Sequence, residues 1–339
     1  MPSIQSLPYM LVAKSLLILF FHLSFCTAAE PSNIKSSTFE FIYAGAITDL
    51  NQGDQASIWL PVASETTEQQ ILATEIKTPK TYQLEHESEH GNQTLFFRAI
   101  ADENGEIPFE VIYRVARSGV SRKQSHDQAP ASPQRYLAGS SLVPIDQNFS
   151  REVLGDEKIS PEPMTAARQI YDAINRRMKY DKPEGEAWGR GDSTWACDSR
   201  FGNCTDFHSL FISICREQLI PAKFEIGFPI PLTKAEGSVG GYHCWAKFAA
   251  KDKWNCVDIS EANKEPSLAD FYFGNQPPDR ITFSSGRDLT LSPKQELGPI
   301  NFLVYPYVEV EGRIHTSLRK DFRFKHLGDR TNRGSDNAK

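Results

Sequence analysis

Gly202-Asn203-Cys204-Thr205-Asp206-Phe207-His208 is the stretch that decides the fold, because it runs from a loop straight into an amphipathic helix. At about 100° of rotation per residue, Cys204 lies on a broad apolar arc of that helix together with Phe207, Leu210, Phe211, Ile212, Ile214 and Cys215. Cys204 falls in the first turn, where unpaired N–H groups and the helix dipole stabilise an anion. A cysteine placed there tends toward the reactive thiolate. A small apolar residue that opens a core helix would give the same pattern, since free cysteine is among the most buried residue types.

His208 lies about 40° around the same helix from Cys204, inside the apolar arc. Three roles stay open for it: a structural histidine, a contact to substrate or to the catalytic residues, and the base that activates the cysteine. The sequence places no carboxylate that would orient this ring. We therefore expect a structural role before the other two.

His243 and Asp258 supply the other groups that papain-like cysteine catalysis needs, an imidazole and a third residue that sets its tautomer. Each lies in a strand candidate, and a short polar turn joins the two strands. If the turn places them directly opposite, both side chains share one face, with Cβ atoms roughly 4.5 to 5.5 Å apart. The same register puts Cys244 and Cys256 on opposite faces, so we expect no disulfide between them. A satisfied strand histidine and a hairpin-end hydrogen bond are the alternative roles.

The order cysteine, histidine, aspartate resembles the transglutaminase-like branch of the papain-like superfamily, as found in exported bacterial transglutaminase-domain proteins. The resemblance covers about Pro163 to Phe283 and rests on Gly202-Asn203-Cys204-Thr205-Asp206, Gly241-Tyr242-His243-Cys244-Trp245 and Trp254-Asn255-Cys256-Val257-Asp258-Ile259. It implies an α+β core in which a helix packs on an antiparallel sheet. It also implies that Cys204 is the nucleophile, His243 the general base and acid, and Asp258 the orienting carboxylate. Members of this superfamily cross-link Gln to Lys through an acyl-enzyme or hydrolyse amide bonds, and some have lost activity.

An oxyanion hole is implied as well, with the backbone N–H of Cys204 as one donor and an indole N–H upstream of the cysteine as the other. Trp195 ranks first on proximity and Trp188 second, although neither has the family's longer separation from the nucleophile. Either tryptophan would serve equally as loop packing. Trp245, beside the histidine, is expected to shield the ion pair from water. The residues expected around the triad are therefore Trp195, Asn203, His208 and Trp245.

The N-terminus has the pattern of a secretory signal peptide, predicted at residues 1–29. Lys14 precedes an apolar run from Leu16 to Phe25, and small residues follow it. The run is about half the length of a spanning helix, although an uncleaved anchor remains the alternative. We expect an exported protein, periplasmic or extracellular, with no membrane span in the mature chain.

Composition and residue spacing argue against nucleic-acid, metal and cofactor binding. The chain has 339 residues and a formal net charge of -6, which gives no basic footprint for nucleic acid. Six cysteines are present, and five remain after removal of Cys26 with the signal peptide, so at least one is free or pairs outside the chain. The pairing among Cys197, Cys215, Cys244 and Cys256 stays open. No zinc-ligand spacing and no glycine-rich phosphate loop occurs, and we expect no metal and no cofactor.

The expected organisation has two main parts. Five short runs between Thr38 and Val115 are rich in β-branched and aromatic residues, which predicts an all-β sandwich at residues 35–120. A linker follows at 121–160 and the catalytic core at 161–284. Within the core we expect helices from Pro163 to Met178 and from Cys204 to Gln218, and strands at Lys223–Phe228, Tyr242–Ala249 and Trp254–Ile259. A closing hairpin is predicted at 285–326, with strands Phe302–Val310 and Arg313–Phe324, and a disordered tail at 327–339.

The predicted function is that of an exported cysteine enzyme acting on amide bonds of a protein or peptide through a thioester. No residue decides between hydrolysis and transfer to an amine, and the oligomeric state stays open. The alternative is an inactive binding or scaffold module of the cell envelope.

Overall fold

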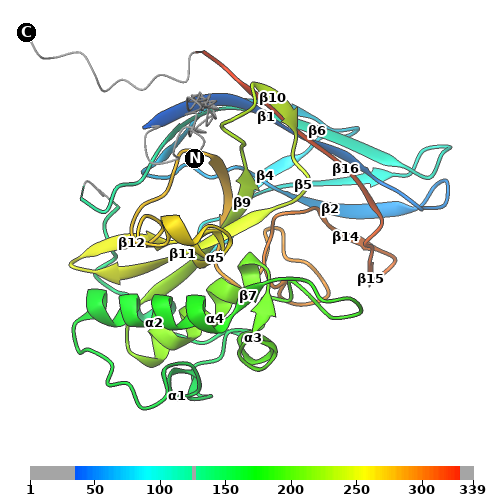
Figure 1. Cartoon of the computed structure of the whole chain (residues 1–339). Helices are drawn as coiled ribbons and strands as arrows, with labels where there is room; N and C mark the ends of the chain where they lie inside the picture. Colours follow the sequence, from blue (N-terminus) through cyan, green and yellow to red (C-terminus); the bar gives the residue numbers. More distant parts are fainter. Residues whose placement is uncertain (1–34, 124–126, 329–339) are drawn as a thin grey trace, which may run out of the picture.

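The computed structural model describes residues 35–123 and 127–328. The predicted signal peptide at 1–29 and most of the predicted tail, 329–339, lie outside the described residues. Figure 1 shows helices at one end of the molecule and most of the β-structure at the other. Of the described helices, none has the length and apolar character needed to cross a bilayer.

Two five-stranded antiparallel sheets make up the β-rich part, which confirms the all-β prediction for the N-terminal region. The first runs in the order β10 (Glu236–Ser238), β16 (Leu318–His326), β1 (Ser36–Ile47), β6 (Ile107–Ser118), β3 (Gln69–Lys77). The second runs β15 (Arg313–Ile314), β14 (Tyr307–Val310), β2 (Gln55–Pro61), β5 (Gln93–Ile100), β4 (Gln83–His86). All five predicted N-terminal runs form strands, and strands from the C-terminal region extend both sheets.

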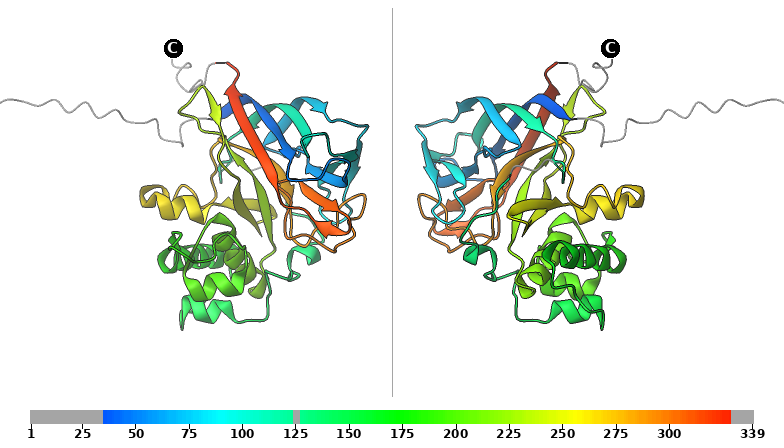
Figure 2. Two further views of the ribbon diagram at one scale, coloured as in Figure 1. Left: turned by 90° about the vertical axis from the view of Figure 1, so that its right-hand side faces the viewer. Right: turned by 90° about the vertical axis from the view of Figure 1, so that its left-hand side faces the viewer.

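The α+β core also forms as predicted. Its antiparallel sheet has the order β12 (Lys253–Val257), β11 (His243–Ala250), β9 (Ala222–Pro229), β13 (Arg280–Ser285). Helix α4 (Cys204–Glu217) packs on β11 and β9. The other helical and short elements are α1 (Phe149–Leu154), α2 (Pro163–Arg177), β7 (Lys179–Tyr180), α3 (Ser193–Ser199), β8 (Phe201–Gly202), α5 (Ile259–Lys264) and the 3-10 helices η2 (Gln134–Tyr136) and η3 (Pro266–Leu268). Figure 2 shows the helices on one side of this sheet and the five-stranded sheets on the other.

Aromatic side chains join the sandwich to the core sheet. The ring of Phe41 on β1 lies 5.2 Å from that of Phe228 on β9, and Tyr43 lies 5.4 Å from Phe283 on β13. Phe322 on β16 completes the group, 4.7 Å from Phe228. These side chains belong to one continuous hydrophobic core that runs from the sandwich into the helices. The face of the core sheet opposite α4 is thus buried by the sandwich.

Two strand predictions were wrong in detail, and two connecting segments contain helices. The closing hairpin turns at Glu311-Gly312, both at positive φ, but Arg313–Phe324 is not one strand. It breaks after β15, and β16 crosses to the first sheet because its alternating Phe322 and Phe324 are buried there. Strand β12 ends at Val257 and not at Ile259, because α5 begins at Ile259. The long connection before Phe201 contains α3, and the segment 121–160 contains η2 and α1.

Candidate active site

Cys204 is the first residue of α4, and its position is fixed by a capping box. The Asn203 side chain accepts the Thr205 N–H at 2.9 Å, and the Asp206 carboxylate accepts the Asn203 N–H at 2.9 Å. The Asn203 amide also donates to the Tyr242 hydroxyl at 3.1 Å. Asn203 therefore holds the cysteine at the positive end of the helix.

Asp206 also ties the preceding loop to the start of α4. Its two carboxylate oxygens accept the N–H groups of Gly189 at 2.9 Å and Gly191 at 2.8 Å. A Cβ at Gly189 would lie 2.5 Å from the Asn203 amide nitrogen, at a backbone φ of +73° that L side chains rarely adopt. The loop that contains Trp188, the residue before Gly189, is therefore anchored at the start of α4.

His243 opens β11, and Asp258 follows β12 as the N-cap residue of α5. The His243 Nε2 lies 2.7 Å from Asp258 Oδ2. The predicted register is wrong by two residues, since Ala246 pairs with Val257 rather than with Asn255. A shift of two preserves the face of every side chain, so the histidine and the aspartate meet diagonally instead of directly opposite each other.

Cys204 and His243 form a hydrogen-bonded pair at the base of the site. Burial raises the pKa of the Cys204 thiol, but hydrogen bonds from Cys244 and His243 lower it by more, to about 5. Burial lowers the pKa of His243, but the charge and hydrogen bond of Asp258 raise it to about 10. Between these values the pair is a thiolate and an imidazolium. Because Asp258 occupies Nε2, Nδ1 is the ring nitrogen left for the sulfur.

Asp258 accepts four hydrogen bonds. Its Oδ2 accepts from His243 and, at 2.9 Å, from Arg280, and its Oδ1 accepts the Ser260 hydroxyl and the Glu261 N–H. Burial raises the pKa of Asp258, but His243 and Arg280 hold it well below its usual range. The carboxylate is thus ionised at neutral pH. Sequence reasoning did not find Arg280, because nothing in its local pattern distinguishes it from another basic residue at a strand end.

His208 is fully buried, and its ring nitrogens face groups other than the Cys204 sulfur. Its Nε2 accepts the Ile259 N–H at 3.1 Å, so the ring proton is on Nδ1, which faces the Cys244 sulfur at 3.5 Å. Burial lowers the pKa of His208 to about 4 despite the nearby charge of Asp258, which keeps the ring neutral. The geometry fits the structural role and gives His208 a carboxylate neighbour, Asp258 Oδ1 at 3.7 Å, that the sequence did not place.

The three tryptophans differ in what their indole N–H groups contact. Trp245 donates to Glu225 at 2.8 Å, and its ring lies 6.2 Å from that of His243. Trp195 packs edge-on against Phe201. Among the described residues, the buried Nε1 of Trp188 has no hydrogen-bond partner. Of these three indoles, that of Trp245 is thus the one with a hydrogen-bond partner shown here.

The remaining cysteines are all buried and free: Cys197, Cys215, Cys244 and Cys256. The prediction that Cys244 and Cys256 are not bonded to each other is confirmed. Burial raises the pKa of the Cys215 and Cys244 thiols well above the usual value. Within 35–123 and 127–328, the structure shows no cluster of three or more histidine, cysteine, aspartate or glutamate residues suited to a metal ion.

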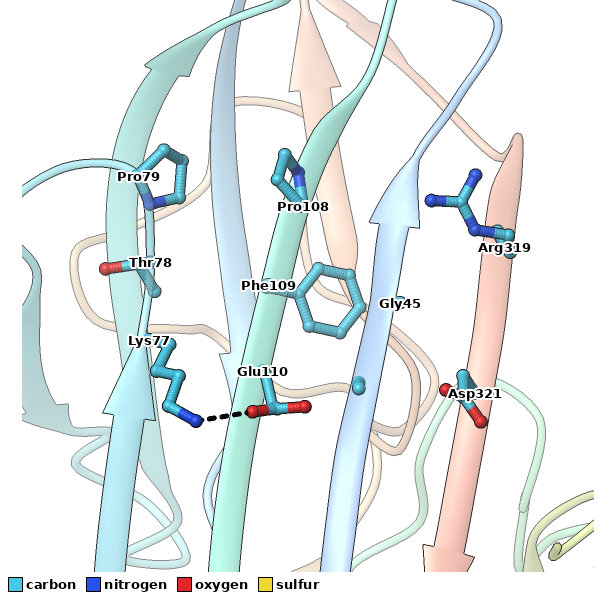
Figure 3. Close-up of a pocket in the computed structure, with 10 residues that line it drawn as sticks. Gly45, Lys77, Thr78, Pro79, Pro108, Phe109, Glu110, Arg319 and Asp321 are labelled. Atoms are coloured by element: carbon cyan, nitrogen blue, oxygen red, sulfur yellow. Dashed lines mark hydrogen bonds and ion pairs between the residues drawn. The ribbon is translucent and has the colours of Figure 1, made fainter.

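A separate hollow of about 490 Å³ lies on the first five-stranded sheet, away from these residues. Figure 3 shows Gly45 on β1 at its centre, with Phe109 and Glu110 of β6 on one side and Arg319 and Asp321 of β16 on the other. Lys77 donates to Glu110 at 2.8 Å across its rim. The hollow and the cysteine site therefore lie on different sheets.

One protein-family model matches the part of the chain that carries the site. Residues 149–259, which include Cys204, His243 and Asp258, match the model of the transglutaminase-like superfamily. The chain carries a transglutaminase-like core. The match supports a cysteine-type enzyme in general terms, and it begins at α1, within the segment expected to be a linker.

Individual relatives are distant. A protein of Haemophilus influenzae with no assigned function is 26% identical over 230 residues, 57% of this chain and 62% of that protein, so the chain spans less than two thirds of its length. A crystal structure from Cytophaga hutchinsonii, of a protein proposed to be a cysteine protease, is 15% identical with a TM-score of 0.54 over 86% of this chain and 98% of the other. That likeness concerns the fold alone. The periplasmic domain of TgpA from Pseudomonas aeruginosa, at 13% identity over 70% of this chain and 96% of the other, has a TM-score of 0.35, too low for argument.

Proposed function

We propose that this transglutaminase-like core is an active cysteine enzyme that cleaves amide bonds through a thioester. The observation that carries the proposal is the geometry: Cys204 is the first residue of α4 and is hydrogen-bonded to His243, whose Nε2 lies 2.7 Å from Asp258 Oδ2. The sulfur attacks the amide carbonyl and forms a C–S bond. His243 gives its proton to the leaving nitrogen as the C–N bond breaks. Water or a second amine, deprotonated by His243, then attacks the thioester and releases the sulfur.

The oxyanion formed in each step needs two donors near the sulfur. We propose the backbone N–H of Cys204 and the indole N–H of Trp188. Support for Trp188 comes from its unpartnered, buried nitrogen and from the tie between Gly189 and Asp206 that anchors its loop at α4. Trp245 is engaged by Glu225 and acts as a cover over the ion pair.

We also propose that the substrate is a protein or peptide and that the enzyme works outside the cytoplasm. The location rests on the N-terminal pattern of Lys14, an apolar run and small residues.

The choice of acceptor is tested by incubating the protein with a glutamine peptide and a fluorescent amine. Incorporation of the amine assigns a transglutaminase, and release of ammonia or peptide cleavage without incorporation assigns a hydrolase. No turnover by either route across a panel of envelope peptides would favour the binding-module alternative.

The rate of Cys204 alkylation by iodoacetamide is expected to increase as the pH rises through about 5. The rate for a free thiol increases only as the pH approaches about 8.5. His243→Ala should move the pH midpoint of this step in the alkylation rate toward that of a free thiol, because the imidazolium that stabilises the thiolate is lost. The pH dependence of the rate, measured by mass spectrometry of the Cys204 peptide, reports ionisation separately from accessibility. His86→Ala, on an exposed part of β4, is the control and should leave the step unchanged. A wild-type step at the free-thiol value would contradict the proposed function.

A further inference from the structure

Arg280 is the one guanidinium that the described residues place against the triad. It opens β13, is 2% exposed, and lies between two carboxylates, with Nη1 2.9 Å from Asp258 Oδ2 and Nε 2.9 Å from Asp279 Oδ1. The ring of Trp245 covers it, with 5.0 Å from the guanidinium carbon to the ring centroid. A buried cation with partners on three sides has a fixed position.

The same carboxylate oxygen serves both Arg280 and His243. Asp258 Oδ2 has two lone-pair directions, which the two donors fill at 2.9 Å and 2.7 Å. The guanidinium therefore weakens the attraction between the carboxylate and the imidazolium proton. Without that cation, Asp258 would bind the histidine proton more strongly, and His243 would be a weaker acid toward a leaving amine.

Arg280 is the cation that offsets the charge of Asp258. The thiolate and the imidazolium cancel, and Asp258 shares the guanidinium with Asp279. The other titratable groups that face the triad are His208 and Asp206 on α4, of which His208 is neutral, Cys244 on β11, Glu261 on α5 with Oε1 3.8 Å from His243 Nε2, and the hydroxyls of Tyr171, Tyr180, Tyr242, Tyr272 and Tyr305. Among these described groups, Arg280 is thus the permanent cation beside Asp258 that limits the negative charge around the proton of His243.

The sandwich holds the strand that carries Arg280. Two residues along β13, the Thr282 N–H donates to Gln69 Oε1 at 2.8 Å, and the Thr282 hydroxyl accepts from Arg117 at 3.1 Å. Gln69 and Arg117 lie on β3 and β6 and are both buried. The position of the guanidinium is therefore set by the β-rich part of the chain as well as by the core.

We propose that Arg280 is a positioning residue that aligns Asp258 with His243 and weakens the hold of both Cys204 and His243 on their protons. This inference rests on the proposed function, since it concerns the same ion pair. It gives the N-terminal sandwich a part in the chemistry, because β3 and β6 fix the strand that presents the guanidinium.

The test is the pH dependence of Cys204 alkylation by iodoacetamide from pH 4 to 11, in Arg280→Gln and Arg280→Lys. In the wild type the alkylation rate should change in two steps, with midpoints near pH 5 and pH 10. Removing a cation favours the protonated forms, so both midpoints should move up by about half a pH unit or more in Arg280→Gln. Arg280→Lys keeps the charge and should recover most of the shift. Asp279→Asn is the matched control: it removes the second, more exposed partner of Arg280, leaves the cation in place, and should not raise either step.

A purely structural Arg280 would lower stability in both variants without raising either step, and that result overturns the inference. If the wild type itself lacks the step near pH 5, the proposed function fails; if the wild type has it and Arg280→Gln matches it, only this inference fails. Should Arg280→Gln not fold, NMR of the wild type supplies the second measurement. The guanidinium N–H protons of Arg280 should exchange slowly and shift when Cys204 is alkylated, and rapid exchange with no shift would equally overturn the inference.

Discussion

Replacing Cys204 by serine is expected to lower turnover by on the order of 10⁶-fold, the scale seen when a nucleophile that works with its base as a unit is removed. A hydroxyl has no accessible anion at neutral pH, so the serine variant has no thiolate to pair with His243. The fold should persist, because the helix start depends on Asn203 and Asp206 and not on the sulfur. Turnover of the glutamine peptide, with circular dichroism to verify folding, measures both effects.

Cys215→Ala is the matched control for this change. Cys215 lies on the same helix, is equally buried and free, and is surrounded by apolar core residues. Its loss should cost some stability and leave the turnover per folded molecule within about twofold. If the serine variant kept a tenth or more of the activity, Cys204 would not be the nucleophile.

Much of this site could be predicted because its local patterns are strong. The place of Cys204 at the start of α4 follows from the change from a loop to an amphipathic helix with one apolar arc. His243 and Asp258 share a face because strand side chains alternate with a period of two, and the two-residue error in register does not alter that. The error itself arose at the turn: Lys251-Asp252, both at positive φ, make a two-residue loop, and the neighbouring pair Ala250-Lys251 fits the same length.

The parts that sequence reasoning missed are contacts between residues far apart in the chain. Arg280 reaches Asp258 only because β13 lies beside β9, and β9 lies beside β11. Strand β16 has the alternation of a hairpin strand, and no local signal shows that its partners are β1 and β10 rather than β14. The loop that carries Trp188 is tied to α4 by the hydrogen bond from the Gly189 N–H to Asp206. Periodicity predicts an element and its buried face, but not which distant element will cover that face.

Lys247→Met is expected to lower the free energy of unfolding by about 3 to 5 kcal/mol, the cost of leaving buried charge without its partner. The Lys247 side chain on β11 is 2% exposed, and its ammonium lies 2.8 Å from Asp127, 3.2 Å from Glu68 and 3.4 Å from Glu225. Burial lowers the pKa of Lys247, but the three carboxylates raise it well above its usual value. Methionine fills a similar volume, so the loss is electrostatic. Denaturation by urea at pH 7 measures it.

The pH dependence of the Lys247→Met effect distinguishes lost charge from lost packing. Burial raises the pKa of Glu225 and of Glu68, but Lys223 and Lys247 lower that of Glu225, and Lys247 and Arg117 lower that of Glu68. A lowered carboxyl pKa contributes stability above the unfolded value of about 4.3 and loses it as pH falls through the folded value. The variant lacks that contribution from Lys247, so its deficit in the free energy of unfolding should be full at pH 7 and shrink below about pH 4.

Lys325→Met is the control: it breaks an exposed pair with Glu236 at 3.9 Å and should change the free energy of unfolding by less than about 1 kcal/mol. Equal effects of the two substitutions at pH 7, or a Lys247→Met deficit that is constant with pH, would show that this buried cluster does not hold the sandwich against the core by charge.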